Sequence, residues 1–133
     1  MSISKEAYEA IRAAGGDPTD RVWDWLMNRG PHGMGFTWSQ TKRQPSGYVG
    51  IEHLQKIVEE LEPAFRDRLR RSLAVALRTT ASELLRRAVQ VGATIGREAD
   101  LLRIVELTDC NNPAVAADAR ASAFYLRRRL VAE

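Results

Sequence analysis

The chain has 133 residues, of which 44% are apolar and 28% charged, and its net charge is +3. This composition is typical of one globular domain and argues against wholesale disorder. The longest apolar runs are a few residues long, far short of the roughly 20 residues that cross a bilayer, which argues against a membrane protein. The single cysteine, Cys110, excludes an intramolecular disulfide, and the N-terminus has no apolar stretch resembling a signal peptide. We therefore expect a cytoplasmic protein.

Two helices are predicted before residue 30. The first covers about 4–14 and ends at Gly15-Gly16, because glycine accepts the left-handed conformation that follows a helix. The second is expected to begin after an N-cap at Asp17, with Pro18 in its first turn, and to run to about Asn28.

The segment 30–50 differs from the rest of the chain. It holds five of the nine glycines and two of the five prolines, together with aromatic and basic residues. A structureless connection of this length is usually either functional or disordered. Aromatic and arginine side chains are enriched at binding hot spots, so we expect a partner-binding site formed by Phe36, Trp38, Lys42, Arg43 and Tyr48. The alternative is that the loop folds over Trp23 and completes the core.

Three helices are predicted in the middle of the chain, over about 50–61, 63–78 and 80–95. Thr80 and Glu83 have the spacing of a capping box at the start of the third helix, and Gly96 ends it. Gly92 lies inside this helix, where glycine is unfavourable, and it predicts a close contact with another helix.

Basic residues are concentrated in the segment 66–87, which holds seven basic and two acidic residues. The favoured interpretation is a solvated helix surface. The alternative is a surface that binds a phosphate backbone, and the residues assigned to it are Arg66, Arg70, Arg71, Arg86 and Arg87. The segment has no evident helix-turn-helix signature.

Two further helices are predicted at the C-terminus, over about 98–109 and from Pro113 to about Val131, the second capped by Asn112. Together, residues 98–130 resemble a single HEAT-type helical repeat. The matching positions are Leu101, Leu102, Val105 and Leu107 in the first helix, Asp109, Asn112, Pro113 and Val115 at the turn, and Ala119 and Ala123 on the small face. Ala116 departs from the pattern, because an arginine commonly follows the valine in that family.

The resemblance implies a protein-binding role without chemistry. It covers about a quarter of the chain, and a lone repeat cannot form a solenoid, since at least roughly three stacked repeats supply the core. The alternative is an ordinary antiparallel helical hairpin with good caps.

No set of residues in the sequence predicts catalysis or a metal site. His32 and His53 are too far apart for a local metal pattern. The glycines of the loop match neither the dinucleotide nor the Walker spacing, and Cys110 has no partner for redox chemistry nearby in the sequence. We therefore expect no cofactor, no metal and no enzymatic activity.

These patterns predict an all-α protein, a compact bundle of about seven helices in one domain over residues 1–133. The function predicted is that of a small non-catalytic protein-binding protein. Its most concrete form is a bacterial immunity protein or an inhibitor that blocks a toxin or an enzyme. The alternative is a nucleic-acid-binding protein that uses the arginine-rich helices over 63–78 and 80–95.

Overall fold

The computed structural model describes residues 3–28 and 48–132, with only the backbone described at Asn28 and at residues 48–53. Within these ranges the chain forms seven helices and no strand, which confirms the predicted all-α fold. The helices are α1 (Lys5–Ala13), α2 (Arg21–Asn28), α4 (Tyr48–Glu59), α5 (Pro63–Ala76), α6 (Ser82–Ile95), α7 (Glu98–Leu107) and α8 (Pro113–Ala132). No helix among the described residues is both long and apolar enough to cross a membrane.

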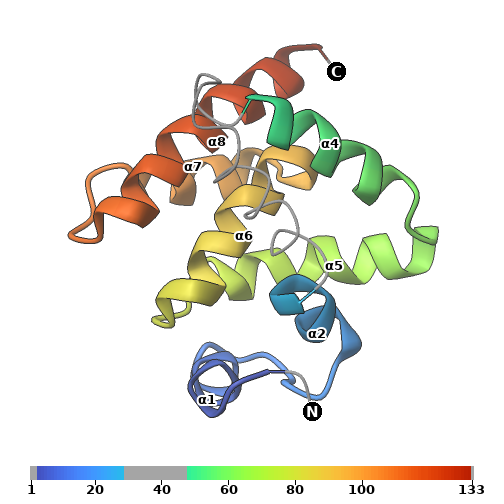
Figure 1. Ribbon diagram of the computed structural model, residues 1–133, viewed down its shortest axis with the longest axis vertical. Coiled ribbons are helices and arrows are strands. Elements are labelled where there is room, and N and C mark those ends of the chain that lie inside the picture. The colour runs from blue at the N-terminus through green and yellow to red at the C-terminus, as the bar shows by residue number, and fades with distance from the viewer. Residues whose placement is uncertain (1–2, 29–47, 133) are drawn as a thin grey trace.

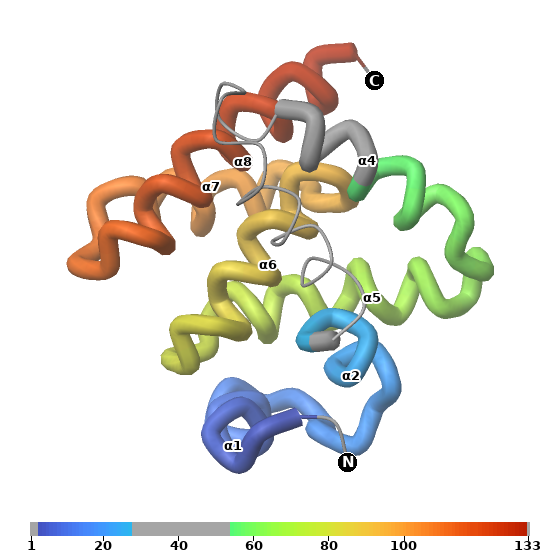
Figure 2. The backbone as a smooth tube through the Cα atoms, viewed as in Figure 1, coloured from blue at the N-terminus to red at the C-terminus, as the bar shows by residue number. Residues whose placement is uncertain are grey.

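Helix α6 lies at the centre of the molecule, between α1 and α2 at one end and α8 at the other (Figure 1). It contacts α2, α4, α5, α7 and α8. Every residue from Arg87 to Ile95 is buried, because neighbouring helices pack against α6 on several sides. The chain therefore begins and ends on opposite sides of this central helix (Figure 2).

Helices α7 and α8 form an antiparallel hairpin that packs on α6 (Figure 1). The Asn112 side chain accepts hydrogen bonds from the backbone N–H groups of Ala114 and Val115, at 3.0 and 3.2 Å. This confirms the predicted cap at the start of α8. Small residues on α8, such as Ala119 and Ala123, are buried, so the helix axes can approach closely.

The start of α2 differs from the prediction. The helix begins at Arg21, and the Asp17 carboxylate accepts hydrogen bonds from the Thr19 N–H and hydroxyl instead of capping a helix. The Asp20 carboxylate, 3.0 Å from the Val22 nitrogen, satisfies the first turn. The indole of Trp23 donates to the Asp17 carbonyl at 2.8 Å, which holds residues 17–20 in a turn before the helix.

The predicted capping box of Thr80 and Glu83 is wrong. Helix α6 begins one residue later than that box requires, with Ala81 at the N-cap and no side-chain hydrogen bond there. Ala81 is buried in the core, and Glu83 pairs with Arg87 on its own helix. Tertiary packing of Ala81 therefore decides the helix start, and the hydroxyl of Thr80 does not.

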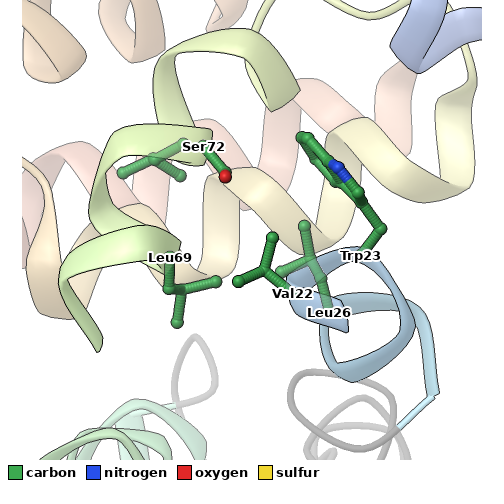
Figure 3. Close-up of a pocket in the computed structure, with 6 residues that line it drawn as sticks. Val22, Trp23, Leu26, Leu69 and Ser72 are labelled. Carbon is green, nitrogen blue, oxygen red and sulfur yellow. The ribbon is translucent and has the colours of Figure 1, made fainter. Parts of the chain in front are cut away.

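The core side of α2 packs against α5. Val22, Trp23 and Leu26 face Leu69, Ser72 and Leu73, and the space between them has no volume for a water molecule (Figure 3). Trp23 is 2% exposed. Trp23 is therefore part of the core, whereas the loop expected to fold over it lies outside the described residues.

Gly92 lies where α6 approaches α7. A Cβ atom at this position would lie 2.8 Å from Cδ1 of Ile104 on α7. This confirms the close helix contact predicted from a glycine inside a helix.

Candidate functional site

The partner-binding loop predicted from the sequence lies largely outside the described residues. This holds for Phe36, Trp38, Lys42 and Arg43, and the described chain resumes at Tyr48, the first residue of α4, whose side chain is not described. The partner-binding loop therefore remains a prediction from the sequence.

Two of the α5 arginines of the predicted nucleic-acid site, Arg66 and Arg70, are half-buried. Arg66 donates to the carbonyl of Glu59 at 3.2 Å, at the corner between α4 and α5. Arg70 pairs with Asp67 one turn earlier, with 3.4 Å between Nη1 and Oδ1. Arg71 is exposed.

The two arginines of α6 face carboxylates. Arg86 Nε lies 2.8 Å from Oδ2 of Asp118 on α8. Arg87 is 9% exposed and pairs with Glu83. Arg86 therefore lies against α8, and Arg66 lies against the end of α4.

Asp118 is the centre of a polar contact between α6 and α8. Its carboxylate accepts from Arg86 and, at 3.4 Å, from the amide of Gln90, while the Ser122 hydroxyl donates to the Val89 carbonyl at 2.7 Å. Burial raises the pKa of the Asp118 carboxyl, against the opposing effect of the Arg86 guanidinium. The arrangement orients the two helices.

The outer face of α8 carries a row of exposed side chains, which we call the α8 ridge. Arg120, Phe124, Arg128 and Val131 follow one another at intervals of four, four and three residues, so they lie on one side of the helix. Phe124 is 51% exposed and Val131 is 87% exposed. The Arg128 guanidinium lies 5.6 Å from the centroid of the Phe124 ring, within the range of a cation–π contact.

The ring of Phe124 is also held by its neighbour. Tyr125 packs edge-on against it, with 5.2 Å between ring centroids. Arg120 donates to the carbonyl of Thr108 at 3.1 Å, which fixes the other end of the ridge. These contacts restrain the exposed side chains.

The ridge is positively charged. Its two arginines, Arg120 and Arg128, are exposed, as is the adjacent Arg127, and the one acidic residue in the described range of α8, Asp118, is buried. The sequence carries a partial signal for this surface, because Phe124 adjoins Ala123 of the predicted small face and adjacent residues of a helix point in different directions. The residue pattern alone did not identify this surface, because a Phe-Tyr pair in an alanine-rich helix can equally face the core.

A second surface feature is a cleft of about 490 Å³ where α5, α7 and α8 meet the end of α6. We call it the arginine cleft, because Arg70, Arg97 and Arg129 line it together with Ile95, Gly96, Glu98, Ala99 and Leu130. The N-terminus of α7, which carries the positive end of the helix dipole, opens onto it. Such a set of donors suits an anion.

No group of three or more His, Cys, Asp or Glu side chains could hold a metal ion within the part of the chain that the structure describes. Cys110 is half-buried, with its sulfur 3.5 Å from the carbonyl of Asn112.

Comparison with known proteins gives no relative of this chain. No family model matches it, and no match is found among curated proteins or among solved structures. The HEAT-type resemblance of residues 98–130 therefore remains a prediction from the residue pattern.

Proposed function

We propose that this protein is a non-catalytic binding protein that inserts the α8 ridge into an acidic groove of another protein. The observation that carries the proposal is Phe124, a large apolar side chain that is 51% exposed and flanked by Arg128 and Tyr125. Aromatic and arginine residues are those in which binding energy concentrates at interfaces.

The ridge has the spacing of a helix that docks in a groove. Phe124, Arg128 and Val131 stand at positions i, i+4 and i+7, which is the pattern of anchors in helix-in-groove recognition. Fully burying a phenylalanine side chain contributes about 1.5–3 kcal/mol, and the half that is exposed here is available to a partner. Because Tyr125 and Arg128 already restrain the ring, less side-chain entropy is lost on binding.

The charge of the ridge selects the partner's chemistry. Its exposed arginines have no exposed acidic neighbour on the described part of α8, so a groove lined by Asp or Glu complements it and speeds association. A single-stranded nucleic acid fits the ridge less well. Proteins that bind single strands stack successive bases on several aromatic rings, whereas the ridge offers one exposed ring.

An immunity protein or inhibitor that covers a toxin or enzyme is the form of this function that we propose. Such a protein acts by occupying a surface and requires no catalytic group. In this form, the loop residues Phe36, Trp38, Lys42, Arg43 and Tyr48 extend the contact beyond α8.

Site-specific photocrosslinking tests the proposal. A p-benzoylphenylalanine placed at position 124 should crosslink one protein in the source cell, and the crosslinked peptide of that protein should be rich in Asp and Glu. The same probe at Leu102, which is 71% exposed on α7, is the matched control and should not capture it. Excess untagged wild-type protein should suppress the crosslink, whereas excess Arg128→Glu protein should not.

Two results would contradict the proposal. One is equal crosslinking from positions 124 and 102. The other is a salt-sensitive complex with DNA or RNA that requires Arg66, Arg70 and Arg71, since phosphate binding weakens steeply as salt is added and that result would support the alternative function instead.

A further inference from the structure

The arginine cleft is a second site, separate from the α8 ridge. Its volume of about 490 Å³ lies within the range of pockets that hold small molecules, about 300–1,000 Å³. Its wall comes from α5, the end of α6, the start of α7 and the end of α8. A ligand bound there would contact four helices at once.

The lining of the cleft combines cationic and apolar residues. Arg70, Arg97 and Arg129 are accompanied by one carboxylate, that of Glu98, and Ile95 and Leu130 supply apolar wall. A planar guanidinium donates paired hydrogen bonds that match the geometry of a phosphate or carboxylate. Three guanidinium groups suit a doubly charged group better than a single carboxylate.

Hydrogen bonds restrain two of the residues that line the cleft. Arg129 donates to the carbonyl of Gly96 and, at 3.4 Å, to the carbonyl of Ala93. The Asp100 carboxylate accepts from the N–H of Arg97 at 2.8 Å, which fixes the turn into α7. These bonds hold two sides of the cleft in place, so a ligand loses less free energy in ordering them.

The guanidinium of Arg70 has a hydrogen-bond donor without an acceptor. Its Nε is buried and makes no hydrogen bond with any described residue, and its Nη1 makes a long contact of 3.4 Å with Asp67. The guanidinium therefore has capacity to reorient toward an anion in the cleft.

We propose that the arginine cleft binds a small phosphorylated molecule, such as a sugar phosphate or a mononucleotide. The phosphate contacts Arg70, Arg97 and Arg129 beside the N-terminus of α7, which favours negative charge. The neutral part of the molecule packs against Ile95 and Leu130. This site does not depend on the partner protein proposed above.

Titration of the ¹⁵N-labelled protein with ribose 5-phosphate, AMP, inorganic phosphate and uncharged ribose tests the site. Both phosphate esters should produce saturable shifts of the Gly96, Arg97 and Ala99 amides, with an affinity at least tenfold higher than that of inorganic phosphate. Ribose should produce none. Calorimetry under the same conditions supplies the dissociation constants.

Variants distinguish a built site from general attraction to positive charge. Arg97→Gln and Arg70→Gln should each weaken binding of the phosphate esters about tenfold, because each removes a charge-assisted contact. Arg12→Gln, an exposed position on α1, is the matched control and should leave the affinity unchanged. Equal weakening by all three variants, equal affinity for inorganic phosphate and the esters, or shifts that do not saturate would each overturn the proposal.

Discussion

Gly96 ends α6 in a position where no other residue fits, and Gly96→Ala should destabilise the fold strongly. A Cβ atom there would lie 2.5 Å from the carbonyl oxygen of Gly92 and 3.3 Å from its carbonyl carbon. It would also lie 3.1 Å from Cδ2 of Leu126 on α8. The obstructing atoms of Gly92 are backbone, and that carbonyl accepts the hydrogen bond of the Gly96 N–H at 2.9 Å. The clash cannot be relieved without moving the last turn of α6.

The size of the effect follows from comparison with two other glycines. Overpacking a core costs about 1–3 kcal/mol, and we expect Gly96→Ala to reach the upper end of that range. Gly92→Ala meets Cδ1 of Ile104 at 2.8 Å, the flexible end of a side chain, and gains roughly 1 kcal/mol of helix propensity, so its net effect should be near zero. A Cβ atom at position 15 would meet no atom within 4 Å, but the φ angle of Gly15 is +92°. An alanine held at this φ angle would cost about 1–2 kcal/mol.

Urea unfolding, followed by far-ultraviolet circular dichroism, measures these three variants. With a slope of about 1–3 kcal/mol per molar urea, Gly96→Ala should lower the midpoint by roughly 1 M or more. The expected order of destabilisation is Gly96→Ala, then Gly15→Ala, then Gly92→Ala. If Gly96→Ala were no less stable than Gly92→Ala, the reasoning from the backbone clash would be refuted.

Three further predictions concern the helix cap, the buried carboxylate and the core indole. Asn112→Ala should cost about 1 kcal/mol in urea unfolding, because it removes the cap of α8; an unchanged midpoint would contradict this role. The pKa of Asp118 in the folded protein lies above its ordinary value of 3.8. At a pH between 3.8 and the folded pKa, the folded state therefore binds more protons at this carboxyl than the unfolded state does. Wild-type stability should therefore fall relative to Asp118→Asn as the pH rises from about 3.8 through the folded pKa; a wild-type gain over that window would mean that Arg86 outweighs burial. Trp23→Phe should cost about 1–3 kcal/mol through lost packing and the lost hydrogen bond to Asp17, and a loss below about 0.5 kcal/mol would refute that estimate.

The sequence predicted the ends of helices correctly where a capping residue or a helix-ending glycine determines them without help from tertiary contacts. Asn112 and Pro113 start α8 as expected, and Gly96 ends α6. The prediction failed where tertiary contacts override local signals. Ala81 takes the N-cap position of α6 because it packs in the core, and Asp17 turns back to Thr19.

The candidate site was less predictable than the fold. The cleft joins Arg70, Arg97 and Arg129 from three parts of the chain, and no sequence period links them. The pair of Arg86 and Asp118 is likewise set by how α8 packs on α6. The role of an exposed residue depends on which face a helix buries, and that face is decided by the neighbouring helices.

The affinity of the protein for its crosslinked partner tests the central proposal most directly. Phe124→Ala and Arg128→Glu should each weaken binding at least tenfold, as expected for hot-spot residues, and leave the urea midpoint unchanged. Leu102→Ala and Arg12→Glu, the matched apolar and charged controls, should bind like the wild type. If Phe124→Ala and Arg128→Glu bound the partner as tightly as these controls, the α8 ridge would not be the binding surface.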